Sequence, residues 1–138
     1  MRIAFATDER TSVTESVVAG LRAGGHQVDL VAEGSEWPEA GRTVGRAVAS
    51  GRAHLGVVCC TSGTGVSIAA NKVPGARAAL CTDAATAVAA RRWNDANVLA
   101  LGLRLTTESL AREVVEAFLA TPFDPDEAGA VGRVEPGA

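Results

Sequence analysis

A short loop, Cys60-Thr61-Ser62-Gly63-Thr64-Gly65, carries the residues best suited to chemistry in this chain. It follows an apolar run typical of a strand and precedes a short helical stretch, so its backbone N–H groups are expected at a helix N-terminus. Two glycines let these groups turn toward one point, which favours a bound anion or an oxyanion. An ordinary tight turn between a strand and a helix fits the same residues, and both interpretations stay open at this stage.

The loop does not have the sequence of a nucleotide-binding motif. No Gly-Lys-Ser or Gly-Lys-Thr follows it, so it is not a Walker A loop, and the full glycine fingerprint of a dinucleotide fold is absent. In an open parallel sheet, ligands bind outside the carboxyl ends of the strands. We therefore expect the loop to share a site with three other segments, namely Asp8-Glu9-Arg10, Glu36-Trp37-Pro38-Glu39 and Trp93-Asn94-Asp95.

The three cysteines, Cys59, Cys60 and Cys81, lack the spacing of metal ligands or of a disulfide framework. A reducing compartment, the cytoplasm, is therefore expected. Neighbouring residues of a strand point to opposite faces, so only one of Cys59 and Cys60 readily faces a cleft. We interpret Cys59 and Cys81 as small buried hydrophobic residues.

The elements that position these residues alternate along the chain as strand-like and amphipathic helical segments, which is typical of parallel βαβ units. We predict an α/β fold, a three-layer α/β/α sandwich of the Rossmann-like kind with a five-stranded parallel sheet. The strands are expected at about 2–7, 27–32, 54–59, 77–81 and 98–101. The helices are expected at about 12–23, 39–50, 66–70, 84–93 and 106–119. Ser12 and Glu15 have the spacing of a capping box, and Asp83 is a cap candidate.

Length and composition predict one globular domain. The 138 residues suffice for one hydrophobic core, which we place at 1–122, whereas the acidic, Pro- and Gly-containing segment 123–138 is expected to be a C-terminal arm or a frayed tail. No signal peptide and no apolar run of about 20 residues is present, so no membrane partner is expected. A net charge of −3 argues against nucleic acid as a partner.

Two blocks resemble the ribose-5-phosphate isomerase B and galactose-6-phosphate isomerase family. The first is the loop continued through Val66-Ser67-Ile68-Ala69-Ala70-Asn71-Lys72 and Val73-Pro74-Gly75-Ala76-Arg77. The second is Asn94-Asp95-Ala96-Asn97-Val98-Leu99-Ala100-Leu101-Gly102, followed by Arg104. The resemblance runs in order from Arg2 to about Pro122.

This resemblance implies an aldose–ketose isomerase that acts through a cis-enediolate without a metal or an organic cofactor. Cys60 falls where many members carry the base that moves a proton between C1 and C2. An ordinary thiol has a pKa of about 8.5, so this role needs a helix N-terminus or a charge that favours the thiolate. Other members use a Glu at the position of Val66, and valine cannot serve. The family also implies a homodimer or a higher even oligomer, because a second subunit completes the site.

The candidate site residues follow from the same correspondence. Residues 62–65 correspond to the loop that stabilises the enediolate oxygen, and Asp8 and Asn94 match positions that bind sugar hydroxyls. Cys60 and Ser62 are the expected catalytic residues. The expected substrate-binding residues are Asp8, Glu9, Gly63, Thr64, Gly65, Trp93, Asn94, Arg104 and Arg133.

Three departures from the family pattern concern the substrate. Glu9 stands where family members usually have a His. Trp93 stands where they have the His that opens the sugar ring, and an indole N–H donates a hydrogen bond but cannot transfer a proton. Family members bind the substrate phosphate partly through an arginine-containing run near the C-terminus. In this chain only Arg133 could take that role, and Glu127 in the same segment would repel a phosphate. Ordinary ribose 5-phosphate is therefore not the expected substrate.

His26 and His54 precede strands, so they are expected at the opposite end of the sheet, in a structural or solvated role. We expect an isomerase or epimerase of this family whose substrate is a sugar or a sugar phosphate other than ribose 5-phosphate. A non-catalytic or regulatory protein that binds a sugar or an anion on the same fold is the alternative.

Overall fold

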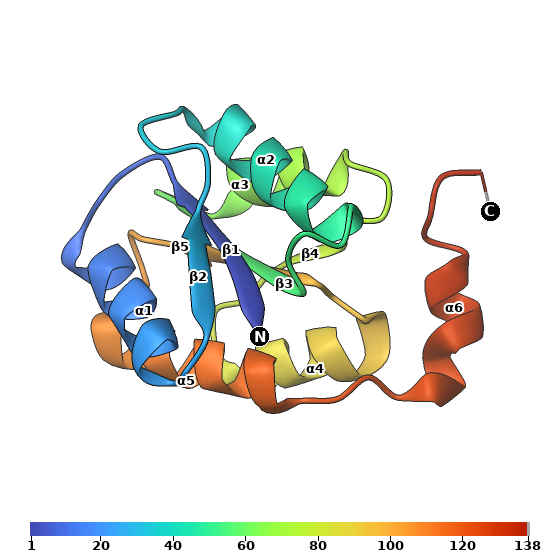
Figure 1. The fold of residues 1–138 in the computed structure, drawn as a ribbon. Coiled ribbons are helices and arrows are strands. Elements are labelled where there is room, and N and C mark those ends of the chain that lie inside the picture. The colour runs from blue at the N-terminus through green and yellow to red at the C-terminus, as the bar shows by residue number, and fades with distance from the viewer. Residues whose placement is uncertain (138) are drawn as a thin grey trace.

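The computed structural model describes residues 1–137 as a parallel sheet with helices on both faces (Figure 1). The sheet consists of β1 (Arg2–Thr7), β2 (Gln27–Leu30), β3 (Leu55–Cys60), β4 (Ala78–Leu80) and β5 (Val98–Gly102). The strands lie in the order β2-β1-β3-β5-β4, and every neighbouring pair is parallel. The predicted three-layer α/β/α sandwich with a five-stranded parallel sheet is confirmed.

Helices α1 (Ser12–Ala23), α4 (Ala84–Asn94) and α5 (Glu108–Ala120) cover one face, and α2 (Trp37–Ala49) and α3 (Thr64–Asn71) cover the other. The buried apolar side chains form two clusters accordingly. One lies around Leu99 and Phe118, and the other around Val44 and Val58. All six residues of β3 are buried, as expected for a central strand that is covered on both faces.

The cap of α1 and the starts of three other helices differ from the sequence prediction, with α2 beginning two residues earlier than predicted and α5 two residues later. The N-cap of α1 is Thr11, whose hydroxyl accepts a hydrogen bond from Thr14 N, while Thr11 N donates to Thr14 Oγ1 at 2.8 Å. The capping box assigned to Ser12 and Glu15 is therefore wrong by one residue, because threonine at both positions forms the reciprocal bonds. Helix α3 begins two residues earlier than predicted, at Thr64. Asp83 caps α4 as predicted, accepting from the backbone of the first turn.

The chain order creates a crevice at the carboxyl ends of the strands. After β1 the chain crosses to β2 on one side of β1, and it then returns to β3 on the other side, so the loops after β1 and β3 diverge there. The two histidines lie at the opposite, amino ends. His26 Nδ1 lies 3.1 Å from the amino terminus, and His54 Nδ1 accepts from Arg2 N at 3.0 Å. Their predicted location away from the carboxyl-end loops is confirmed.

The C-terminal segment contains η1 (Pro125–Glu127) and α6 (Ala128–Gly132), which stand apart from the sandwich in Figure 1. Its two ends contact the domain. Asp124 N donates to Arg92 O at 2.9 Å, and the Glu135 carboxylate accepts from Gly75 N at 2.9 Å and from Arg77 Nη1 at 2.7 Å. The segment therefore has the geometry of an arm, while its division from a domain at 1–122 stays a prediction.

None of the helices between residues 1 and 137 is long and apolar enough to cross a membrane.

Candidate active site

Three loops meet at the carboxyl edge of the sheet, where β1, β3 and β5 end side by side. Asp8 N, directly after β1, donates to Cys59 O at 3.4 Å. Leu103 N, directly after β5, donates to Cys60 O at 2.9 Å, and Arg104 N donates to Thr61 O at 2.9 Å. The loop that begins at Cys60 is thus held by backbone hydrogen bonds to the segment after β5. Arg104 makes one of these bonds with its backbone N–H, and the residue is exposed.

The loop turns back on the Cys60 thiol. Gly63 is the N-cap of α3 in the left-handed conformation, with φ of 78°, and its N–H donates to Cys60 Sγ at 3.2 Å. Ser62 Oγ and Thr64 Oγ1 are hydrogen-bonded at 2.7 Å, and both residues are exposed. The thiol, the two hydroxyls and the start of α3 therefore lie together, as the sequence predicted for residues 60–65.

The N-terminus of α3 leaves backbone donors for a ligand. The first bond of the helical ladder is donated by Ser67 N to Gly63 O at 3.2 Å. Of the preceding residues, Thr64 donates its N–H to Ser62 Oγ at 3.4 Å, whereas the N–H of Gly65 has no acceptor within a helix that starts at Thr64. Such donors and the helix dipole favour negative charge at this end, which supports the anion or oxyanion interpretation of the loop.

Glycine is required at two positions of the loop by close approach. A Cβ on Gly63 would lie 2.5 Å from Leu80 Cδ1 and 2.9 Å from Gly102 N. A Cβ on Gly65 would lie 2.8 Å from Cε3 of Trp37, so the indole packs directly on the backbone of the loop. Trp37 remains 44% exposed, and its indole forms a wall beside the loop. Trp37 belongs to the segment 36–39 that was expected to share the site with this loop, although it was not among the candidate site residues.

The other two cysteines are in different environments. Cys59 points into the cluster around Leu99, on the face of the sheet opposite to that of Cys60, which confirms the alternation expected for a strand. Burial raises the pKa of the Cys59 thiol far above its ordinary range. Burial, with a smaller effect from Asp83, raises the pKa of Cys81 to about 11. Both behave as buried hydrophobic residues, as predicted. Cys60 is 5% exposed, so access to its sulfur is narrow.

Asp8 and Glu9 place two carboxylates next to the loop. Both residues are exposed, and Thr7 Oγ1 donates to Glu9 O at 2.7 Å, which tightens the turn after β1. Partial burial and, to a smaller extent, the Glu9 carboxylate raise the pKa of Asp8. These positions fit a role in accepting hydrogen bonds from substrate hydroxyls, which stays a prediction.

Trp93 and Asn94 lie at the other edge of the sheet. Asn94 ends α4, and the segment after it enters β5 at its amino end, where Asn97 Oδ1 accepts from Arg77 N at 2.7 Å. The expectation that residues 93–95 join the carboxyl-end loops is therefore wrong within one chain. The physical reason is the topology, because a segment that leads from a helix into a parallel strand lies at the amino edge, opposite to the end of β3 at Cys60.

The C-terminal arm shares the edge with Trp93 and Asn94. Both residues line a cavity of about 440 Å³ together with Val131 and Val134 of the arm. Arg133 is exposed between these two valines, and its Nη1 donates to a carbonyl one turn earlier, at 3.1 Å. One chain thus holds the candidate residues in two separate groups, one at the carboxyl edge and one at the amino edge.

Residues 1–137 contain no group of three or more His, Cys, Asp or Glu side chains arranged to hold a metal ion.

Comparison with known proteins identifies relatives along almost the whole chain. Residues 3–135 match the model of the family described as Ribose/Galactose Isomerase. The chain is 35% identical over 120 residues to D-erythrulose-4-phosphate isomerase of Pectobacterium atrosepticum, covering 86% of this chain and 79% of the relative. It is 39% identical over 92 residues to ribose-5-phosphate isomerase B of Escherichia coli, covering 67% of this chain and 62% of that protein.

Solved structures agree over the full fold. Ribose-5-phosphate isomerase B of Clostridium thermocellum superposes with a TM-score of 0.91 at 36% identity, covering 97% of this chain and 95% of that chain. The type B enzyme of Trypanosoma brucei superposes with a TM-score of 0.90 at 37% identity, covering 99% and 98%.

Proposed function

The chain belongs to the ribose/galactose isomerase family of sugar-phosphate isomerases, and we propose that it interconverts an aldose and a ketose through an enediolate with Cys60 as the base. The observation that carries this proposal is the 3.2 Å hydrogen bond from Gly63 N to Cys60 Sγ at the start of α3. A donor at a helix N-terminus favours the thiolate, which is the form that accepts a proton from carbon.

The proposed reaction moves one hydrogen between neighbouring carbons. The Cys60 thiolate takes the proton from the carbon beside the carbonyl, and the electron pair moves onto the carbonyl oxygen to give the enediolate. The thiol then returns the proton to the other carbon, while the hydroxyl proton passes between the two oxygens. Substrate and product are isomers, so no oxidant or reductant is consumed. Donors at the start of α3, including Gly65 N–H, would face the developing oxyanion, where one such donor is typically worth about 3 kcal/mol.

The two groups of candidate residues support a site shared between subunits. Cys60, Ser62 and Asp8 lie at the carboxyl edge, whereas Asn94 and Arg133 lie at the amino edge of the same chain. A second copy related by a two-fold axis can place its amino edge over the carboxyl edge of the first and receive the same contact in return. We therefore propose a homodimer or a higher even oligomer with two such sites in each pair.

The substrate proposed from these residues is an acyclic sugar phosphate. Trp93 lies at the position at which the resemblance places the ring-opening acid, and its indole N–H can donate a hydrogen bond but cannot transfer its proton to a ring oxygen. A four-carbon sugar that carries phosphate on O4 cannot close a furanose ring, so it needs no such acid. A curated relative of the chain is named for a substrate of this class, D-erythrulose 4-phosphate. We propose that four-carbon sugar phosphates are better substrates than ribose 5-phosphate.

Trp93 in place of the ring-opening His also favours a second candidate function, a protein that binds a sugar phosphate without converting it. The geometry of the Cys60 loop is retained in either case, so only turnover separates the two.

A substrate panel tests the proposal. Isomerisation of D-erythrulose 4-phosphate and of ribose 5-phosphate is measured with the purified protein, together with binding of each compound by calorimetry. We expect the four-carbon substrate to have the higher kcat/KM, and Trp93→His to raise turnover of ribose 5-phosphate selectively. Binding of both compounds with no turnover of either would establish the binding protein instead. A higher kcat/KM for ribose 5-phosphate in the unmodified chain would overturn the substrate proposal.

A further inference from the structure

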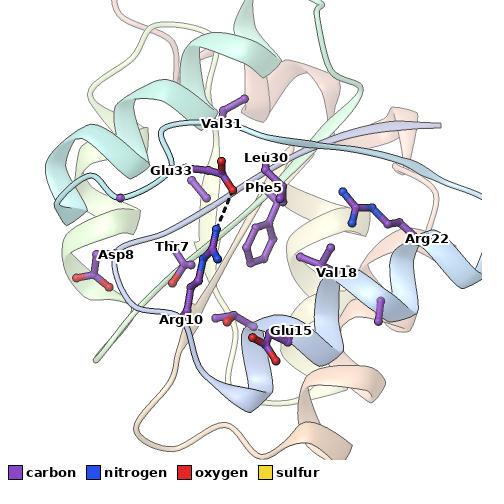
Figure 2. Close-up of a pocket in the computed structure, with 14 residues that line it drawn as sticks. Phe5, Thr7, Asp8, Arg10, Glu15, Val18, Arg22, Leu30, Val31 and Glu33 are labelled. Carbon is purple, nitrogen blue, oxygen red and sulfur yellow. Dashed lines mark hydrogen bonds and ion pairs between the residues drawn. The ribbon is translucent and has the colours of Figure 1, made fainter.

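A second cavity of about 430 Å³ lies between α1 and the ends of β1 and β2, outside the Cys60 loop (Figure 2). No residue of the loop at 60–65 lines it. Its volume lies within the range of about 300–1,000 Å³ that is common for small-molecule sites. Of the candidate isomerase residues, Asp8 alone lines this cavity, and the proton transfer assigned to Cys60 gives the rest of it no role.

The floor of the cavity is apolar. Phe5 at its base is 3% exposed, whereas Val18 and Leu30 beside it are partly open to solvent. Figure 2 shows the ring of Phe5 in its centre, with Val18 of α1 on one side and Leu30 of β2 on another. Leu30 ends the edge strand β2 and is 40% exposed, so it offers apolar surface to a ligand. An apolar ring that is laid on this floor would remove part of that surface from water, with a gain of about 25 cal/mol for each Å².

The rim carries charges of both signs. Arg10 and Glu33 form an ion pair at 2.9 Å across the cavity, so they neutralise each other. Arg22 and Glu15, both on α1, also line the cavity, and within residues 1–137 neither has an ion-pair partner. Two turns of helix separate them, which corresponds to about 10 Å along the axis. Asp8 points away from Phe5 in Figure 2 and leaves the floor free.

We propose that this cavity is a binding site for a small amphipathic molecule with a flat apolar ring. Its ring lies on Val18 and Leu30, an anionic group at one end pairs with Arg22, and a hydrogen-bond donor at the other end reaches Glu15. The site would hold its ligand whether or not the protein is an isomerase. Because Thr7 and Asp8 belong to its wall, an occupant contacts the segment that carries Asp8 to the sugar site.

The probe for this site is 6-hydroxy-2-naphthoate, which has an apolar ring, a carboxylate at one end and a hydroxyl donor at the other. Titration of the full-length, ¹⁵N-labelled protein is followed by the amide signals. We expect saturable shifts at Thr7, Val18 and Gly34, which line the cavity, and none at Ser67 in α3 or at Ala23, which lines the neighbouring cavity between α1 and α5.

Two variants, each with a matched control, test the contacts. Arg22→Gln should weaken binding of the probe roughly two- to fivefold, as for an exposed ion pair, whereas Arg112→Gln, at the rim of the neighbouring cavity, should not. Leu30→Ser should weaken binding more strongly, whereas Leu105→Ser, at a residue that is 77% exposed and does not line the cavity, should leave it unchanged. 2-Naphthol, which lacks the carboxylate, should bind equally to the unmodified protein and to Arg22→Gln.

Several outcomes would overturn the proposal. They are the absence of saturable shifts up to millimolar probe, shifts centred on the neighbouring cavity, and equal effects of Arg22→Gln and Arg112→Gln. A protein that binds the probe only when it is diluted to monomers would show that a second copy covers the cavity, and this would also exclude a ligand site. The spectrum of each variant without probe shows whether its fold is retained, so a loss of binding is not confused with unfolding.

Discussion

Replacing Gly63 by alanine adds only one methyl group, but it should destabilise the protein strongly. Gly63 has φ of 78°, a conformation that costs an L-residue roughly 1–2 kcal/mol. The added Cβ would also lie 2.5 Å from Leu80 Cδ1 and 2.9 Å from two backbone atoms of the β5 end, Gly102 N and Leu101 C. Leu80 can move, but the backbone of a central strand cannot do so cheaply.

The magnitude follows from these two effects. Overpacking of this kind typically costs about 1–3 kcal/mol, so together with the backbone strain we expect Gly63→Ala to lower the free energy of unfolding by about 2–5 kcal/mol. Gly51→Ala is the matched control, because Gly51 has φ of 82° and nothing lies within 4 Å of its added Cβ. In the control, the free energy of unfolding should therefore fall only by the cost of the backbone strain, about 1–2 kcal/mol.

Urea unfolding of both variants at one protein concentration measures this difference, with the concentration fixed because assembly contributes to stability. The slope of the free energy against urea should stay unchanged, and the midpoint should fall further for Gly63→Ala. Equal losses for the two variants would refute the close approach of the loop to β5, and with it the geometry that brings Gly63 N–H to the Cys60 thiol.

Three further predictions concern the thiols, the arm and the assembly. Iodoacetamide should label Cys60 faster than Cys59 or Cys81, because burial raises the pKa of both of the latter; equally slow labelling of all three would remove the basis for a Cys60 thiolate. The pKa of Glu135 lies below its ordinary 4.5, mainly because the carboxylate accepts from Gly75 N. The stabilisation of the docked arm is therefore present above about pH 4.5 and is lost as the pH falls through the lower value in the folded protein. The Gly75 amide signal should move over that acidic range in the unmodified protein and stay constant in Glu135→Gln, and movement in both would contradict the assignment. Sedimentation should give a dimer or a higher even oligomer at micromolar concentration, whereas a monomer would leave the residues of the amino edge without a site to complete.

Most of the fold could be predicted from the sequence because its signals are local. Strands β1, β3 and β5 are runs of mostly buried residues bounded by turn residues, and β1 was predicted with the bounds that the structure gives it. Helix starts were less certain. Threonine at both 11 and 14 forms the capping box, which the spacing of Ser12 and Glu15 concealed. The start of α3 was placed late because Gly63 in a left-handed conformation caps the helix earlier.

The candidate site was predictable only in its local part. The two glycines indicated that the backbone N–H groups of residues 60–65 turn toward one point at a helix N-terminus. The position of Trp93 and Asn94 was misplaced because it depends on which edge of the sheet a segment reaches, and this is a property of the connections. The contact of Trp37 with Gly65 and the bond from Arg77 to Glu135, 58 residues apart, arise from tertiary packing that no local pattern encodes.

The proton transfer assigned to Cys60 is tested most directly by exchange of the substrate carbon proton with solvent. D-Erythrulose 4-phosphate is incubated with the protein in deuterium oxide, and deuterium at the carbons beside the carbonyl is followed by NMR. We predict rapid incorporation with the unmodified protein and with Cys59→Ser, and incorporation at the uncatalysed rate with Cys60→Ser, whose melting temperature should stay within a few degrees of that of the unmodified protein. Undiminished exchange in a folded Cys60→Ser protein would contradict the assignment of Cys60 as the base.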